Sequence, residues 1–132
     1  MNLSPKVWGP HAWFFLDSIV ISIDNENIAD YKAFFEHIQK VLPCAGCRTH
    51  YGEYLEQNPL TNIKTKDEFL IWIHNLHNLV RKRSKTPPRS MASVLSFYEN
   101  QYGNSSFYSY CTIAAAIMAF IVIFLYRARK TA

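Results

Sequence analysis

Apolar side chains recur every three or four residues through most of the first hundred positions of the chain, and this spacing places them on one face of an α-helix. Residues 8–23 illustrate the pattern, with Trp13, Leu16, Ile19, Val20 and Ile23 on the expected apolar face. No segment alternates convincingly between apolar and polar residues, and no Asn-Gly dipeptide marks a hairpin turn. The pattern therefore predicts an all-α fold.

Helix-breaking residues divide this pattern into five expected helices joined by short loops. They cover residues 8–23, 28–42, a segment from the cysteine pair at 44 to 57, a segment that starts at 65, and 91–102. Pro43 ends the second helix. Thr65 followed by Glu68 is a capping-box pattern, which predicts the start of the fourth helix. Helices of this length with short connections favour a helical bundle.

The length of the chain limits how large the core of this bundle can be. With 132 residues the chain suggests one domain, and its hydrophobic fraction of 49% suits a packed core. Part of that fraction belongs to a C-terminal segment, which leaves a soluble core of roughly 100 residues. A core of that size folds alone but is marginal. A bound cofactor or a dimer partner would stabilise it.

The C-terminal segment at residues 107–126 differs from the rest because it contains no charged residue. Twenty helical residues span about 30 Å, the thickness of the hydrocarbon core of a bilayer. Tyr108, Tyr110 and Tyr126 lie near its ends, where membrane helices collect aromatic residues. The segment is expected to be a single-pass transmembrane helix, because so small a domain could hardly enclose it as a buried core helix.

Basic residues form two clusters that account for much of the formal net charge of +4. The clusters indicate either an anionic partner, such as nucleic acid, a cofactor phosphate or a lipid head group, or a solvated helix end and membrane-flanking charge. No nucleic-acid-binding motif accompanies them, so no nucleic-acid partner is expected. Their members are Arg81, Lys82, Arg83, Lys85 and Arg89, followed near the C-terminus by Arg127, Arg129 and Lys130.

Two of the three cysteines, Cys44 and Cys47, are three residues apart at the expected start of the third helix. In a first helical turn they lie on one side and close enough to bridge. The unpaired amides and the positive dipole of a helix N-terminus favour a thiolate, which is the species that attacks disulfides. The spacing suits a redox disulfide. Half of a zinc site with His50, His74 or His77, a thioredoxin-like motif and a plain structural bridge remain alternatives.

Three stretches, taken together and in order, resemble the Erv/ALR family of FAD-linked sulfhydryl oxidases. They are WGPHAW at 8–13, LPCAGC at 42–47 and WIHNLHNLV at 72–80. The resemblance covers residues 5–102. The tryptophan-glycine-proline opening and the short chain look most like members of the family that are encoded by large DNA viruses.

The resemblance implies a four-helix bundle with a short fifth helix, often dimeric, that holds FAD at the mouth of the bundle. Together with the segment pattern, it divides the chain into three parts. These are an Erv/ALR-like sulfhydryl oxidase domain at 1–104, a linker and transmembrane helix at 105–126, and a basic tail at 127–132.

The resemblance also implies an activity, which is the FAD-dependent oxidation of thiols to disulfides in protein substrates. Cys44 and Cys47 match the catalytic pair of the family, with Cys47 beside the flavin ring and Cys44 as the outer sulfur that a substrate thiol attacks. Electrons would pass from the pair to FAD and then to O2, which becomes H2O2. The alternative is a non-enzymatic, membrane-anchored helical adaptor whose cysteines bind zinc or brace a turn.

The family pattern assigns a set of cofactor-binding residues and no metal ligands. Three of them depart from the family, since Asp17 stands where a histidine is usual, Arg81 where an asparagine is common, and Lys85 one position away from a family lysine. The full set is Trp8, Gly9, Trp13, Asp17, His74, His77, Asn78, Val80, Arg81, Lys82, Lys85 and Tyr98.

The third cysteine, Cys111, is single and lies at the expected membrane boundary. An odd number of cysteines argues against a secreted disulfide framework. Many family members carry a second pair that relays electrons from the substrate. Its absence implies that a protein dithiol, such as a thioredoxin-like or CxxC carrier, reaches Cys44 directly.

The orientation of the expected anchor rests on two cues that conflict. The short, polar N-terminus, residues 1–7, predicts no signal peptide. A C-terminal anchor without one suggests an enzyme domain in the cytosol of an infected host cell or at the virion membrane, as in similar virus members of the family. The basic tail alone favours the opposite orientation.

Overall fold

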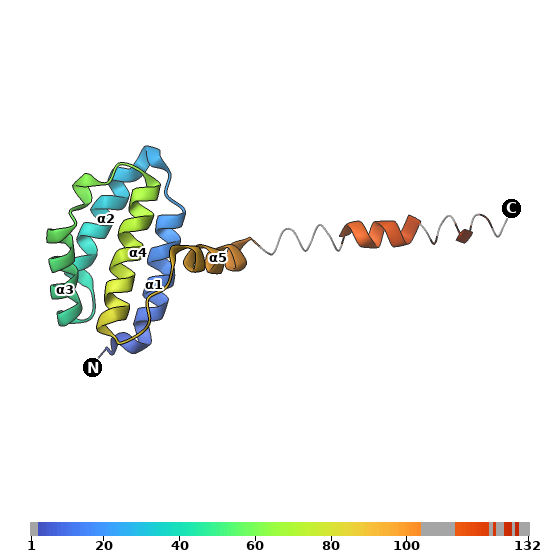
Figure 1. The fold of residues 1–132 in the computed structure, drawn as a ribbon. Coiled ribbons are helices and arrows are strands. Elements are labelled where there is room, and N and C mark those ends of the chain that lie inside the picture. Colours follow the sequence, from blue (N-terminus) through green and yellow to red (C-terminus); the bar gives the residue numbers. More distant parts are fainter. Residues whose placement is uncertain (1–2, 104–112, 122, 124–125, 128, 130–132) are drawn as a thin grey trace. The chain divides into compact units, whose positions relative to one another are not determined.

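The computed structural model describes residues 3–103, 113–121, 123, 126, 127 and 129, and its described part is helical without strands (Figure 1). The all-α prediction is therefore confirmed. In chain order the elements are α1 (Pro5–Ile21), the 3₁₀ turn η1 (Asn25–Asn27), α2 (Ile28–Val41), α3 (Ala45–Gln57), the 3₁₀ turn η2 (Leu60–Asn62), α4 (Lys66–Arg83) and α5 (Met91–Tyr102). The chain divides into two units, Met1–Met91 and Ala92–Ala132.

The first and fourth helices show how local sequence sets helix starts. Thr65 caps α4 in the predicted capping box, with Glu68 bonded back to the cap backbone. Helix α1 begins at Pro5, three residues before the expected start. Ser4 is its N-cap and accepts a hydrogen bond from the Lys6 N–H at 3.3 Å, while proline suits the first helical position because it lacks an N–H to leave unpaired.

Helices α1 to α4 form the bundle of the first unit, in which α1 packs on α4 and α2 on α3. Figure 1 shows that the start of α1, the end of α2, the start of α3 and the end of α4 share one end of the bundle. We call this the cysteine end, because the motif at residues 43–47 joins α2 to α3 there. The opposite end holds η1, η2 and the start of α4.

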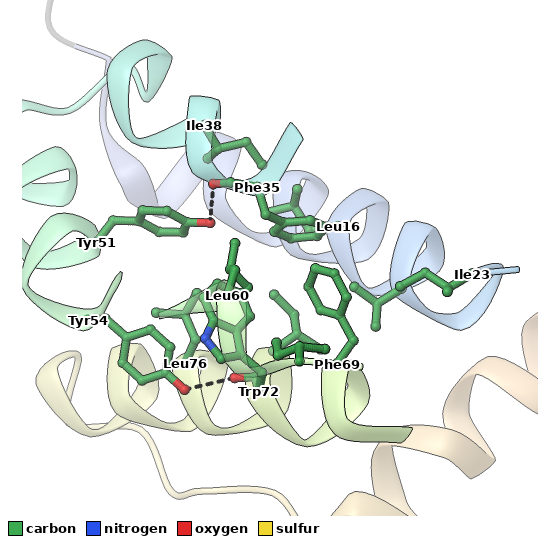
Figure 2. Close-up of a cluster of buried hydrophobic side chains, with 13 residues drawn as sticks. Leu16, Ile23, Phe35, Ile38, Tyr51, Tyr54, Leu60, Phe69, Trp72 and Leu76 are labelled. Carbon is green, nitrogen blue, oxygen red and sulfur yellow. Dashed lines mark hydrogen bonds between the residues drawn. The ribbon is translucent and has the colours of Figure 1, made fainter. Parts of the chain in front are cut away.

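Aromatic rings fill the centre of this bundle (Figure 2). Trp72 packs edge-on against Phe35, Phe69 and Tyr51, and its indole N–H donates to the Asn58 carbonyl at 2.8 Å. The hydroxyl of Tyr51 donates to the Phe35 carbonyl at 2.7 Å. Its burial then leaves no unpaired polar group, which would otherwise cost about 1–3 kcal/mol.

A second buried tyrosine, Tyr54, also has its hydroxyl group hydrogen-bonded to a backbone carbonyl. The hydroxyl of Tyr54 donates to the Trp72 carbonyl at 2.9 Å. Burial raises the pKa of Tyr54 to about 12, and it raises the pKa of Tyr51 further. Both hydroxyls therefore stay protonated and act as donors that tie α3 to α2 and α4. The connection between α3 and α4 also joins the core, since Leu60 and Ile63 are buried.

The second unit contains α5, in which Tyr98 is buried and its ring stacks on Tyr102 with centroids 6.3 Å apart. Residues 113–121 are helical with exposed side chains. Among the described residues, we find no helix that combines the length and the apolar character needed to cross a bilayer. The expected transmembrane segment at 107–126 includes positions outside the described residues, and Cys111 is one of them.

Candidate active site

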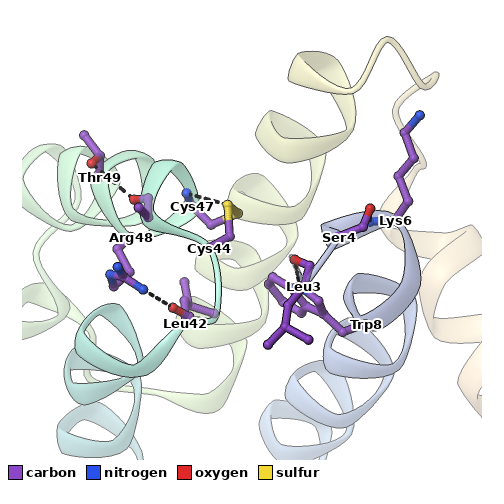
Figure 3. Close-up of a disulfide and its surroundings, with 10 residues drawn as sticks. Leu3, Ser4, Lys6, Trp8, Leu42, Cys44, Cys47, Arg48 and Thr49 are labelled. Carbon is purple, nitrogen blue, oxygen red and sulfur yellow. Dashed lines mark hydrogen bonds between the residues drawn. A yellow bond between two sulfur atoms is a disulfide. The ribbon is translucent and has the colours of Figure 1, made fainter. Parts of the chain in front are cut away.

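The two cysteines of the motif form a disulfide at the N-terminus of α3 (Figure 3). Their Cα atoms are 5.1 Å apart, within the range usual for disulfides. Cys44 is the N-cap residue, and the backbone N–H of Cys47 donates to the Cys44 Sγ at 3.2 Å. A sulfur thus takes the place in which most helices have a serine or aspartate oxygen. The predicted position of the pair, in a first helical turn, is confirmed.

Proline places this helix start. A residue before proline avoids the helical conformation, and Leu42 accordingly has an extended ψ of 133°. Helix α2 therefore ends at Val41 and a new helix begins at Ala45. The guanidinium of Arg48 donates to the Leu42 carbonyl and holds the corner together. Sequence reasoning missed this role of Arg48.

The outer side of the disulfide is open. Both cysteines are partly exposed, and Pro43, Ala45 and Gly46 between and beside them are exposed. A Cβ atom added at Gly46 would meet nothing within 4 Å. Another molecule can therefore approach the sulfurs from this side.

The surroundings of the pair favour a disulfide over the other interpretations. The motif joins two helices, whereas a thioredoxin-like motif follows a strand. The described residues hold no group of three or more His, Cys, Asp or Glu side chains arranged to bind a metal ion. The two sulfurs are bonded to each other, so they are not available as zinc ligands in this state.

A second cluster of predicted site residues lies between α1 and α4. The rings of Trp13 and His77 are parallel, with an interplanar angle of 5° and centroids 4.0 Å apart. The His77 Nδ1 lies 3.4 Å from a carboxylate oxygen of Asp17, which is only 6% exposed. The carboxylate that departs from the family pattern is thus paired with an imidazole. Three of the predicted residues are brought together here.

The side-chain amide of Asn78, a predicted site residue, forms hydrogen bonds with other groups of the protein. Its oxygen accepts from the Arg89 N–H at 2.9 Å, and its nitrogen donates to the Arg89 carbonyl at 2.9 Å. The same nitrogen lies 3.0 Å from the His74 Nε2. Burial lowers the pKa of His74, and the neighbouring His77 lowers it further while Asp17 opposes both effects. Through its two hydrogen bonds to the Arg89 backbone, Asn78 holds the segment at 84–90 against α4.

The basic segment after α4 turns sharply. Lys85 has a φ of 56°, and the N–H groups of Lys85 and Thr86 donate to the carbonyls of Lys82 and Arg81 at 3.1 and 2.8 Å. This is a Schellman motif with lysine at the position where glycine is usual. The Nε of Arg81 donates to the Pro87 carbonyl at 2.7 Å. The side chains of Lys82 and Lys85 are exposed.

The remaining predicted residues are less closely grouped. Trp8, on α1 at the cysteine end, donates from its indole to the Leu3 carbonyl at 3.3 Å (Figure 3). A Cβ at Gly9 would meet nothing within 4 Å, and Val80 is half-buried on α4. Tyr98 belongs to the second unit, so its role in the site stays a prediction.

The geometry defines what these residues can do. The disulfide can exchange with an incoming thiol. Trp13 and His77 offer parallel, partly exposed aromatic planes, and Arg81 follows His77 by one helical turn. Aromatic planes beside a basic helix end suit a ligand that has both flat rings and anionic groups. The Asp17–His77 and Asn78–Arg89 contacts had no signal in the sequence, because each depends on how distant segments meet.

Comparison with known proteins points to one family. The model of the Erv1 / Alr family matches residues 10–103. An African swine fever virus protein named FAD-linked sulfhydryl oxidase is 31% identical over 112 residues, which are 76% of this chain and 92% of that protein. A probable FAD-linked sulfhydryl oxidase of Acanthamoeba polyphaga mimivirus is 28% identical over 102 residues, 70% of this chain and 71% of the relative.

A third relative, from Invertebrate iridescent virus 3, is named a putative FAD-linked sulfhydryl oxidase. It is 25% identical over 103 residues, 74% of this chain and 70% of that protein. The family match includes the disulfide and the Trp13–Asp17–His77 cluster.

Proposed function

This chain belongs to the Erv1 / Alr family, and we propose that its Cys44–Cys47 disulfide is the centre at which protein dithiols are oxidised. The protein is an FAD-dependent thiol oxidase, as the names of its viral relatives indicate. The observation that carries the proposal is a disulfide at an exposed helix start, where both exchange and thiolate formation are favoured. The adaptor alternative is set aside, because it does not explain this family membership.

The exchange begins when a substrate thiolate attacks the Sγ of Cys44. The bond between Cys44 and Cys47 breaks, a mixed disulfide forms, and Cys47 leaves as a thiolate. The second substrate thiolate then attacks the substrate sulfur of the mixed disulfide and releases Cys44 as a thiolate. Two electrons and two protons have left the substrate, which now contains a disulfide. Both enzyme cysteines are reduced.

The cap position of Cys44 favours the second of these steps. A thiolate at Cys44 accepts the Cys47 N–H and lies at the positive end of the α3 dipole. Both effects stabilise the anion, and a stabilised thiolate leaves faster. We assign Cys44 as the sulfur attacked by substrate and Cys47 as the sulfur next to the cofactor, in agreement with the family order of the motif.

The cofactor of the enzyme is FAD. It supplies the two-electron chemistry that links the reduced cysteine pair to oxygen, which becomes hydrogen peroxide. We propose that the flat rings and the diphosphate of FAD are held by the residues assigned from the family pattern. The parallel planes of Trp13 and His77 and the basic end of α4 fit these two parts of the molecule. The set is Trp8, Gly9, Trp13, Asp17, His74, His77, Asn78, Val80, Arg81, Lys82, Lys85 and Tyr98.

Two of these residues act by holding others. The buried carboxylate of Asp17 is paired with His77, so we infer that it orients this imidazole and keeps its plane parallel to Trp13. The carboxamide of Asn78 is bonded to the backbone of Arg89. We therefore infer that it positions the basic segment and does not itself supply the main contact to the cofactor.

We further propose that the enzyme works as a homodimer on a thioredoxin-like or other CxxC carrier protein. Exposed aromatic side chains on neighbouring faces of α1 and α2 support the dimer. Phe15 is 58% exposed and Phe34 is 40% exposed, and their rings pack edge-on with centroids 6.5 Å apart. A second copy of the chain would cover this apolar surface.

We propose that residues 107–126 anchor the protein in a membrane, with the enzyme domain on the cytosolic side in an infected host cell or at the virion membrane. Support comes from the run of residues without charge and from the exposed apolar side chains on the helical residues 113–121. Arg127, at the end of this run, suits a position at the lipid head groups.

The proposed function is tested with purified full-length protein. It is expected to show the visible absorption of bound flavin and to release hydrogen peroxide in an amount equal to the disulfide formed in a peptide dithiol. Cys44→Ser should keep the flavin and lose the oxidation of the dithiol, because no disulfide remains to be attacked. Cys111→Ser is the matched control and should keep both. A colourless protein that contains zinc, or an unimpaired Cys44→Ser variant, would contradict the assignment.

A further inference from the structure

Charged side chains are divided between the two ends of the bundle. The segments that meet at the cysteine end, residues 3–13, 37–51 and 75–90, contain no aspartate or glutamate. They carry eight basic residues, which are Lys6, Lys40, Arg48, Arg81, Lys82, Arg83, Lys85 and Arg89. Of these, Arg83 is paired with Glu53 from the middle of α3, at 3.2 Å. The cysteine end is therefore strongly cationic.

The opposite end of the bundle is mixed in charge, because Lys32, Lys64 and Lys66 lie there beside five acidic residues. It holds the acidic residues around η1 and at the starts of α2 and α4, which are Asp24, Glu26, Asp30, Asp67 and Glu68. Several of these have a structural reason, since Asp24 caps η1 and Glu68 completes the capping box of α4. Acidic side chains also stabilise the first turn of a helix through its dipole.

Helix stability explains the positions of only some of the basic residues at the cysteine end. Lys40 is in the last turn of α2 and Arg81 to Arg83 are in the last turn of α4, where the helix dipole favours cations. Lys6 and Arg48 lie near the starts of α1 and α3, whose first turns have no acidic residue. A cation near a helix N-terminus is unfavourable by about 0.3–1 kcal/mol. Arg48 offsets this through its bond to Leu42, but Lys6 is exposed.

Lys40 and Arg48 are also the cations nearest to the disulfide along the chain, and Lys6 lies on α1 at the same end of the bundle. Arg48 follows Cys47 directly and Lys40 precedes Cys44 by four residues. Lys6 is in the first turn of α1, beside the motif, and its side chain is directed away from the disulfide towards solvent (Figure 3). They form what we call the basic rim. Arg81, Lys82 and Lys85 are assigned above to the cofactor, and Arg83 is paired with Glu53, so the rim needs a separate explanation.

We propose that the basic rim recognises an acidic protein dithiol, whose cysteines are flanked by aspartate and glutamate. This inference rests on the proposed function and names the class of substrate that reaches Cys44. Opposite charges on the enzyme and its substrate mainly raise the rate at which the two associate, and they affect the rate of thiol–disulfide exchange less. The rim also offsets the raised thiol pKa that neighbouring carboxylates impose on a substrate cysteine, and so favours the attacking thiolate.

The first experiment uses the full-length, FAD-loaded enzyme and two peptides that share one CxxC core. One peptide has glutamates on both sides of the core and the other has lysines. At low salt kcat/KM should be higher for the acidic peptide by about tenfold or more. The ratio should fall towards one at high salt, because the screening length shortens from about 10 Å at 0.1 M to about 3 Å at 1 M.

The second experiment changes the rim. The double variant Lys6→Glu, Lys40→Glu should reduce the ratio of the two kcat/KM values by roughly tenfold. Lys66→Glu is the matched control, because it reverses a charge in the first turn of α4 at the opposite end and suits the helix dipole there. The control should keep the wild-type ratio. Since both peptides meet the same enzyme preparation, partial loss of folded protein cancels in the ratio.

The outcome separates this inference from the proposed function. Dithiothreitol, a neutral dithiol, reports the disulfide chemistry without the rim. Equal kcat/KM values for the two peptides, with no effect of salt, would overturn the acidic-substrate inference. If the enzyme still oxidised dithiothreitol, the proposed thiol oxidase function would remain supported. A rim that binds anionic vesicles but does not discriminate between the peptides would also overturn the acidic-substrate inference. Failure to oxidise any dithiol would instead remove the proposed function.

Discussion

Cys44 combines two roles that proteins usually give to different residues. It is one half of the disulfide and also the N-cap of α3, through the bond from the Cys47 N–H to its sulfur. A capping side chain is worth about 1 kcal/mol of helix stability. The oxidation state of the Cys44 sulfur and the stability of the first turn of α3 are therefore coupled. Cys47, inside that turn, has no such role.

Substitutions at Cys44 should separate the cap from the disulfide. Cys44→Ser and Cys44→Ala both remove the disulfide, but serine keeps a capping oxygen and alanine does not. We expect the free energy of unfolding, measured by urea denaturation, to be about 1 kcal/mol lower for Cys44→Ala than for Cys44→Ser. The pair Cys47→Ser and Cys47→Ala is the control and should differ by less. Equal stability of the two Cys44 variants would show that the cap is unimportant.

At the scale of elements, the end of α4 contains a conformation that its side chain does not favour. Lys85 has a positive φ in a motif that usually has glycine. The left-handed region costs a non-glycine residue roughly 1–2 kcal/mol. A residue held there at a cost is a reason to look for a role of its side chain. The cofactor assignment gives Lys85 that role, as a cation for the diphosphate of FAD.

Lys85→Gly should therefore move two measurements in opposite directions. We expect the free energy of unfolding of the FAD-free protein to rise by about 1 kcal/mol. Retention of FAD during gel filtration should fall, because the cation is lost. Lys82→Gly, within α4, is a control for the stability measurement only, because Lys82 is also assigned to the cofactor. It should lower the free energy of unfolding by about 1 kcal/mol, since glycine is unfavourable inside a helix. An unchanged FAD retention in Lys85→Gly would remove this residue from the proposed site.

The limits of sequence reasoning also appear at this scale. Helix type, the capping box at Thr65 and the break at Pro43 could be predicted, because each depends on neighbouring residues. The pairing of Asp17 with His77 could not, since it depends on how α1 is rotated against α4. The early start of α1 was missed because the cap at Ser4 lies outside the apolar pattern.

The same limits apply within the site. The cysteine pair was placed correctly because spacing and helix position are local properties. The contact between Asn78 and Arg89 joins residues on either side of a turn, and the sequence contains no signal for it. It changes the interpretation of Asn78 from a cofactor contact to a residue that positions the basic segment.

At the scale of the whole molecule, the first unit builds its stability from a small aromatic core. Phe35, Phe69 and Trp72 lie at its centre. A bundle of this size buries a modest share of its surface and is marginal alone. A cofactor that binds only the folded chain adds stability that grows with the logarithm of its free concentration relative to Kd.

Loading with FAD should therefore raise the melting temperature in a concentration-dependent way. At a free FAD concentration of 100 times Kd the gain is about 2.7 kcal/mol, or roughly 10–20 °C for a domain of this size. Riboflavin, which lacks the diphosphate and the adenine, is the matched ligand and should stabilise less at the same concentration. Equal effects of the two ligands in a scanning fluorimetry experiment would mean that the basic end of α4 does not hold the diphosphate.

The shortness of the disulfide has a consequence for the life of the protein. A crosslink between residues three apart closes a very small loop, and small loops restrain the unfolded chain least. The core at Phe35, Phe69 and Trp72 includes neither cysteine. We therefore expect the chain to fold with its sulfurs still reduced, and the fold to change little when the disulfide opens and closes during electron transfer.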